Sequence, residues 1–142
     1  MLLRRPPTQY RSGAVAVELA ILMPLIMFFA VIGVDYARIF SRTMILETAS
    51  RNAAIWACQD IDHAKNAAQI KVIAEKDLTD VSPTPTVTSR VYRGTDGWDY
   101  VKVTVAMPFE TITRFPGVPA QSDLSRTTDM RVLPMLPKPG TY

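Results

Sequence analysis

The stretch that decides the fold lies at residues 14–34 and reads AVAVELAILMPLIMFFAVIGV. Glu18 is the only charged residue in it. An α-helix rises about 1.5 Å per residue, so about 20 residues cross the hydrocarbon core of a bilayer. The segment is long and apolar enough to do so, and it predicts a single transmembrane helix.

The charges around this segment predict its orientation. Arg4, Arg5 and Arg11 precede it, and Asp35, Arg38 and Arg42 follow it. The positive-inside rule therefore favours a cytoplasmic N-terminus. The formal net charge of +3 and the pI of about 9.2 reflect this orientation rather than nucleic-acid binding, because no other basic block carries interleaved aromatic residues.

The segment is expected to remain in the protein as an anchor. A cleaved signal peptide has a shorter apolar core followed by a small-x-small site. Ala30 and Gly33 form no convincing site of this kind, and the helical pattern continues past them.

Two residues inside the segment break local rules. Pro24 lacks a backbone donor and crowds the carbonyl of Ala20, so we expect a helix kink at Pro24. A carboxylate at the bilayer centre costs about 2.5 kcal/mol or more. Glu18 lies near the cytoplasmic end, where reaching toward the headgroups reduces that cost. On these grounds Glu18 can be interpreted either as a carboxylate tolerated at the interface or as a functional group.

The residues around Gly13 resemble the cleavage region of type IV prepilins. Basic residues precede Gly13, and Ala14 to Val17 lead to Glu18 and a long apolar run. The resemblance implies cleavage between Gly13 and Ala14 by a cytoplasm-facing peptidase, with glutamate as the fifth mature residue. The new amino group at Ala14 would be positive, and Glu18 would supply a countercharge on its own chain or on a neighbour.

Beyond the membrane the pattern predicts an α+β domain. The first helix is expected to continue to about Cys58 or Gln59, because no glycine or proline interrupts residues 35–59. Its predicted apolar face consists of Ile45, Leu46, Ala49, Ala53 and Trp56, opposite Glu47 and Arg51. A break at residues 60–63, with Asp62 as a cap, precedes a second helix at 64–78, whose apolar stripe is Ala67, Ile70, Ala74 and Leu78.

A small antiparallel sheet of about three strands is expected to follow. Residues 86–93 predict a strand, 94–97 a turn, and 100–107 a strand whose inward residues are Val101, Val103, Val105 and Met107. Pro108, Pro116, Gly117 and Pro119 predict a loop, and residues 125–133 a third strand with Met130 and Val132 inward. The proline-rich tail at 134–142 is expected to be extended.

Nothing in the sequence predicts catalysis. The single cysteine, Cys58, and the single histidine, His63, exclude an internal disulfide and a zinc site. We interpret them as a packed thiol and a solvated imidazole. The sequence holds no phosphate-binding loop or nucleophile motif, so we expect no enzyme activity, cofactor, metal or small-molecule substrate. The acids at 60, 62, 77 and 80 are assigned to helix ends, and Asp96 and Asp99 to the turn.

The chain resembles the TadE-like family, the minor pilins or pseudopilins of Flp/Tad pili. Residues 11–18, RSGAVAVE, followed by LAILMPLI with Pro24, resemble the N-terminal region of the family. Residues 101–105 and 129–131 resemble its C-terminal half less specifically. Major Flp pilins carry tyrosine after the glutamate, and Leu19 stands there instead, which favours a minor subunit.

The resemblance implies pilus assembly in initiation, priming or tip formation, and hence a link to cell adhesion. The implied partners are the membrane, the prepilin peptidase, TadF-like and TadG-like pseudopilins, the major Flp pilin and the inner-membrane assembly platform. Residues 1–13 would be a cytoplasmic basic leader, 14–34 the span of the bacterial inner membrane, and 35–142 a periplasmic pilin-like domain. The mature protein would stay in the membrane or enter the pilus. The alternative is an unprocessed signal-anchor protein whose extracytoplasmic domain binds a ligand, and an anchored enzyme ranks third.

Overall fold

A computed structural model describes residues 10–112 and 121–134 of the chain. The expectations for Arg4, Arg5, the loop at 116–119 and the tail after Pro134 lie outside the described residues. The chain divides into two compact units, Met1–Ala37 and Arg38–Tyr142, which are described separately. We call the second unit the head.

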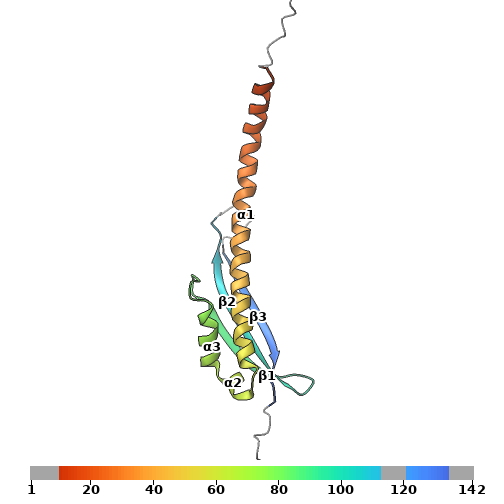
Figure 1. Ribbon diagram of the computed structural model, residues 1–142, viewed down its shortest axis with the longest axis vertical. Helices are drawn as coiled ribbons and strands as arrows, with labels where there is room; N and C mark the ends of the chain where they lie inside the picture. The colour runs from red at the N-terminus through yellow and green to blue at the C-terminus, as the bar shows by residue number, and fades with distance from the viewer. Residues whose placement is uncertain (1–9, 113–120, 135–142) are drawn as a thin grey trace, which may run out of the picture. The chain divides into compact units, whose positions relative to one another are not determined.

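The first helix, α1, runs from Tyr10 to Ala57 and contains Pro24 (Figure 1). This confirms the predicted long helix. The observed helix ends at Ala57, one residue before the expected end at Cys58 or Gln59. Within the first unit the described side chains are almost all exposed, and no residue of the most apolar stretch of α1 is buried. The part of α1 in this unit is therefore not a core helix of a globular domain, and it has the length and composition to cross a membrane.

Two short helices follow, where the sequence predicted one. They are α2, Ile61–Lys65, and α3, Ala67–Lys76. Asn66 separates them, because its ψ of 72° is not helical and its side chain accepts a hydrogen bond from the N–H of Gln69, which caps α3. The predicted Asp62 cap is wrong, since Asp60 is the N-cap of α2 and accepts from the N–H of His63.

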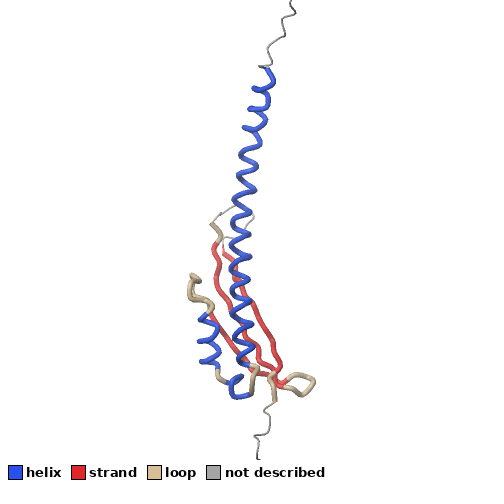
Figure 2. The backbone as a smooth tube through the Cα atoms, viewed as in Figure 1, coloured by secondary structure: helices blue, strands red, loops and turns tan. Residues whose placement is uncertain are grey.

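The sheet has three antiparallel strands in the order β1-β2-β3 (Figure 2), which confirms the α+β fold class. They are β1, Thr86–Arg93, β2, Asp99–Glu110, and β3, Gln121–Arg131. The first has the predicted bounds. The second is longer than predicted and includes Pro108, which was expected in a loop. Beyond Ala106 only β3 pairs with β2, so β2 has an open edge there, where proline is tolerated.

The core of the head lies between α1, α3 and one face of the sheet. Alternate side chains of β2 are buried, as the alternation predicted, because successive residues of a strand point to opposite faces. They pack with small residues of α1 and apolar residues of α3. The fully buried members of this core include Leu46, Ala49, Ala53, Ala54, Ala57, Ile70, Ala74, Val101, Val103 and Val105. Met130 is half-buried and Val132 is buried, as expected.

Candidate functional site

The predicted cleavage position lies in the first turns of α1. Gly13 and Ala14 are helical and exposed. A Cβ atom added at Gly13 would meet no atom within 4 Å. A larger side chain at this position is therefore compatible with the helix, and its effect on cleavage would report the fit of the peptidase rather than the fold. Glycine also lowers helix stability by about 1 kcal/mol relative to alanine.

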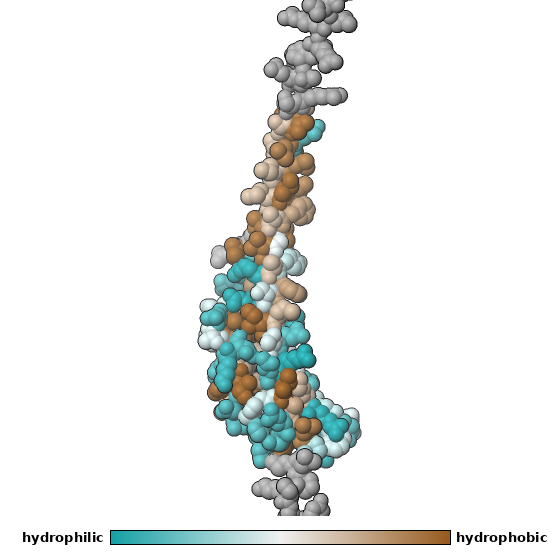
Figure 3. All heavy atoms as spheres, viewed as in Figure 1, coloured by the Kyte–Doolittle hydropathy of each residue, from teal (hydrophilic) through white to brown (hydrophobic). Residues whose placement is uncertain are grey.

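Glu18 follows Ala14 by four residues on the same helix and is exposed. Residues four apart on a helix are neighbours on one face. An amino group at Ala14 could therefore approach the Glu18 carboxylate within one chain. Exposed apolar side chains surround this pair along the helix, Val15, Val17, Leu19 and Ile21 among them. Figure 3 shows hydrophobic residues covering most of this part of α1 in the view drawn.

Pro24 lies inside α1, and the helical assignment continues on both sides of it. The kink at this residue stays a prediction.

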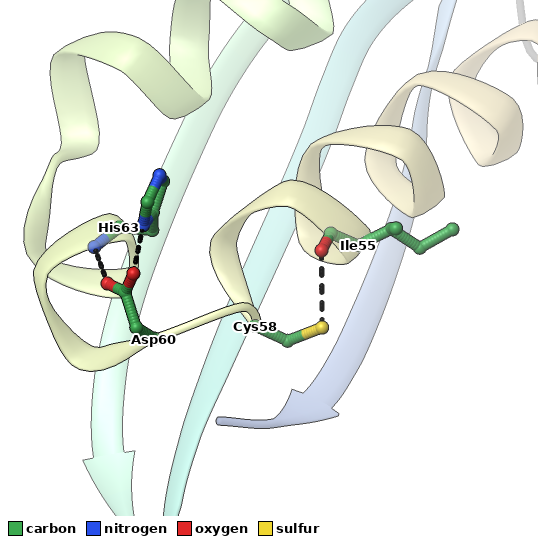
Figure 4. A network of polar contacts seen from close by, with 4 residues as sticks. All are labelled: Ile55, Cys58, Asp60 and His63. Carbon is green, nitrogen blue, oxygen red and sulfur yellow. Dashed lines mark hydrogen bonds and ion pairs between the residues drawn. The ribbon is translucent and has the colours of Figure 1, made fainter. Parts of the chain in front are cut away.

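In the head, Cys58 and His63 make separate contacts (Figure 4). The Cys58 thiol donates to the carbonyl of Ile55 at 3.2 Å. The His63 ring contacts the Asp60 carboxylate through Nδ1 and packs edge-on against Trp56, with 4.4 Å between ring centroids. The backbone N–H of His63 is the main cause that lowers the pKa of Asp60. The two side chains thus stabilise helix ends and do not converge on a ligand.

Two acidic residues of the head, Asp77 and Asp96, also make local structural contacts. Asp77 is the C-cap of α3, and its side chain accepts from Asn52 at 2.8 Å. In the turn before β2, Asp96 accepts from the Tyr100 hydroxyl at 2.7 Å and from the N–H of Trp98. Both hydrogen bonds lower the pKa of Asp96, and the bond from Tyr100 has the larger effect. Over the described ranges, 10–112 and 121–134, no group of His, Cys, Asp and Glu residues could hold a metal ion.

Sequence reasoning missed two clusters of side chains. At the turn between β1 and β2, Arg131 lies over the ring of Trp98 at 3.7 Å, and Tyr92 stacks on Tyr100. At the other end of the sheet, the guanidinium of Arg38 lies 5.3 Å from the ring centroid of Phe109. No sequence signal predicts the contacts of Arg131 with Trp98 or of Arg38 with Phe109, because the members of each pair are far apart in the chain and meet only in the tertiary structure.

Comparison with known proteins bears on the N-terminal half. No curated protein and no solved structure matches the chain significantly. One family model matches, that of TadE-like protein, over residues 13–54. The match begins at Gly13, includes Ala14, Glu18 and Pro24, and ends near the C-terminus of α1. Over residues 13–54 the chain is therefore similar to the TadE-like family.

Proposed function

We propose that this protein is a minor pilin or pseudopilin that takes part in assembling a Flp/Tad pilus. The observation that carries the proposal is the TadE-like match that begins at Gly13 and covers most of α1. The exposed apolar side chains of α1 in the first unit support it, because such a surface needs lipid or other apolar helices around it. The role is assembly rather than catalysis.

Maturation would begin with hydrolysis of the Gly13–Ala14 peptide bond by the prepilin peptidase. Water adds to the carbonyl carbon of Gly13, the bond to the Ala14 nitrogen breaks, and a carboxylate and an amino group result. The basic leader, residues 1–13, leaves with its arginines. The protein would then keep residues 14–34 in the bacterial inner membrane and residues 35–142 in the periplasm.

Glu18 would act after cleavage. The new ammonium group at Ala14 is costly in an apolar environment unless a carboxylate compensates it. Glu18 lies one turn away on the same helix and can do so within the chain or for a neighbouring subunit. The subunit could then join TadF-like or TadG-like companions, the major Flp pilin and the assembly platform, in initiation, priming or the tip.

Cleavage is tested with Gly13→Leu. Wild type co-expressed with its peptidase should begin at Ala14 on N-terminal sequencing, whereas Gly13→Leu should keep residues 1–13. The matched control is Gly33→Leu, because a Cβ at Gly33 also meets no atom within 4 Å. This control should be cut normally. A wild-type chain that keeps the leader would reject the processing step and favour an unprocessed signal-anchor protein.

The countercharge is tested with Glu18→Ala and Glu18→Gln. Both variants should be cut at Gly13 and inserted, yet fail to co-purify with pilus subunits or to support piliation. Gln keeps the shape of the side chain and removes its charge, so it should fail nearly as badly as Ala. Glu47→Gln, an exposed change elsewhere on α1, is the control and should assemble normally. Normal piliation by both Glu18 variants would reject the hypothesis that Glu18 neutralises the amino group at Ala14.

Orientation is tested with a reporter fused after Tyr142. A reporter that works only in the periplasm should be active there. Activity of a cytoplasm-only reporter at this position would overturn the orientation and the pilin assignment together.

A further inference from the structure

The head holds a cavity of about 390 Å³ at the end of the sheet that carries the turn between β1 and β2 and lies beside α2 (Figure 1). This volume lies within the range of about 300–1,000 Å³ typical of small-ligand pockets. Ile61, at the start of α2, and Leu133, after β3, contribute apolar side chains to the lining. The lining also includes Arg93 at the end of β1, Trp98 of the turn and Asp99 at the start of β2. The cavity therefore lies entirely within the head.

Trp98 is held in place by contacts with its neighbours. Its backbone N–H donates to the Asp96 carboxylate at 3.1 Å, and its carbonyl accepts from the N–H of Gly94 at 2.7 Å. The guanidinium carbon of Arg131 lies 3.7 Å from the centroid of its ring. Trp98 is nevertheless 40% exposed. A fixed and partly exposed indole offers a flat apolar surface to a ligand at little cost in conformational entropy.

Arg93 and Asp99 add polar groups of opposite charge to the same cavity. The two residues are partners in the register of β1 and β2. Within the part of the chain that the structure describes, neither side chain forms an ion pair. A guanidinium donates up to five hydrogen bonds, and a carboxylate accepts several. Both side chains are thus available to bind the hydroxyl groups of a ligand.

The charges at this cavity indicate an uncharged ligand. Among the lining residues, Arg93 and Asp99 balance each other. Asp96, which is bonded to the N–H of Trp98, offsets the charge of Arg131 over the ring. A nucleic acid or an acidic polysaccharide gains little from a site without net charge.

A pyranose ring has the chemistry that this lining requires. Its axial C–H bonds form an apolar face, which stacks on an indole ring. Its hydroxyl groups lie around the edge of the ring, where each donates and accepts hydrogen bonds. We propose that the cavity binds a neutral hexopyranose unit of a glycan, with the C–H face on Trp98 and the hydroxyl groups on Arg93 and Asp99. This inference goes beyond the assembly role and uses only residues of the head.

The test is saturation-transfer NMR of the full chain in a detergent without a sugar headgroup. The probes are maltose, cellobiose and N,N′-diacetylchitobiose, which are all uncharged. At least one should bind wild type with a Kd below about 10 mM, and saturation should be largest at its ring C–H protons. Trp98→Ala should weaken this binding by on the order of tenfold, and Trp98→Phe by less, because a smaller ring remains. Arg93→Gln should also weaken it by on the order of tenfold, through loss of charge-assisted hydrogen bonds.

The matched control is Arg90→Gln, which changes an exposed arginine on the same strand that does not line the cavity. It should bind as wild type does. Failure of all the probes to bind wild type, or an equal loss in Arg90→Gln, would overturn the proposal. Unchanged binding by Arg93→Gln would overturn it too, and this exposed change tests the site even if Trp98→Ala does not fold.

Two further probes test the charge of the ligand. A sulfated disaccharide and a thymidine oligonucleotide should each bind more weakly than the best neutral sugar. Tighter binding of either one would overturn the proposal, because the site would then take an anion. The measurement uses neither cleavage nor piliation, so its failure leaves the assembly role standing. A chain that binds the sugar but keeps residues 1–13 would reject the processing step alone.

Discussion

Replacing Ala53 by leucine tests whether α1 packs on the sheet through small side chains. Ala53 is 0% exposed. It belongs to the same buried cluster as Ile70, Val101 and Val103. A β-carbon is all that fills this position, so α1 can approach the sheet closely. Leucine adds an isopropyl group to a site from which solvent is already excluded.

The expected loss of stability follows from overpacking. Extra methylene groups in a filled core typically cost about 1–3 kcal/mol, because neighbouring side chains leave their rotamers or the helix shifts. For a domain the size of the head, about 1 kcal/mol lowers the Tm by about 4 °C. Ala53→Leu should therefore lower the Tm of the head by about 4–12 °C.

The assay is thermal unfolding of the full chain in detergent, followed by the tryptophan fluorescence, to which Trp56, packed against this cluster, contributes. The control is Ala68→Leu, an exposed position in α3, which should change stability by less than about 0.5 kcal/mol. A Tm of Ala53→Leu within about 2 °C of wild type would refute the close packing of α1 on the sheet.

Three further changes test other parts of the head. Gly97 has φ +81°, so Gly97→Ala should cost about 1–2 kcal/mol in chemical denaturation, and Gly97→Asn less, since asparagine tolerates this region. The folded-state pKa of Asp60 lies below its ordinary value of 3.8, so its stabilisation is present above that value and is lost as the pH falls through the lowered pKa. Asp60→Asn keeps a good N-cap and should flatten this acid limb in melts across the pH range, whereas an unchanged limb would contradict the assignment. The buried Ser50 hydroxyl lies 2.9 Å from the Thr128 hydroxyl, so Ser50→Ala should lower the free energy of unfolding by about 1–2 kcal/mol. The double variant Ser50→Ala/Thr128→Val should recover part of this loss. Equal melting temperatures for the single and the double variant would refute the hydrogen bond's contribution.

Most of the secondary structure could be predicted because it follows from short-range periodicity. Residues 86–93 form β1 with the expected bounds, and the alternation of Val101, Val103 and Val105 correctly identified the buried face of β2. The errors arose where one side chain changes a local outcome. Asn66 caps α3 and divides the second helix, and Pro108 remains in β2 because the pairing of β2 with β1 stops at Ala106. Helical periodicity does not reveal the cap at Asn66, and the inclusion of Pro108 in β2 depends on which strands are neighbours.

The candidate assembly site is readable from the sequence because Gly13, Ala14, Glu18 and Pro24 are close in the chain. Helical geometry alone places residues 14 and 18 on one face. The clusters of the head are different. Arg38 reaches Phe109, and Arg131 reaches Trp98, only when the strand register and the packing of α1 on the sheet are known.

The sequence by itself determined the apolar helix, the order and type of the main elements, and the resemblance to a pilus-associated family. These depend on interactions between residues a few positions apart. Only the tertiary structure decided which small residues of α1 meet the sheet, and that Ile61, Arg93 and Leu133 line one cavity. The physical reason is that such contacts join residues distant in the chain, and packing and strand pairing, rather than local propensity, bring those residues together.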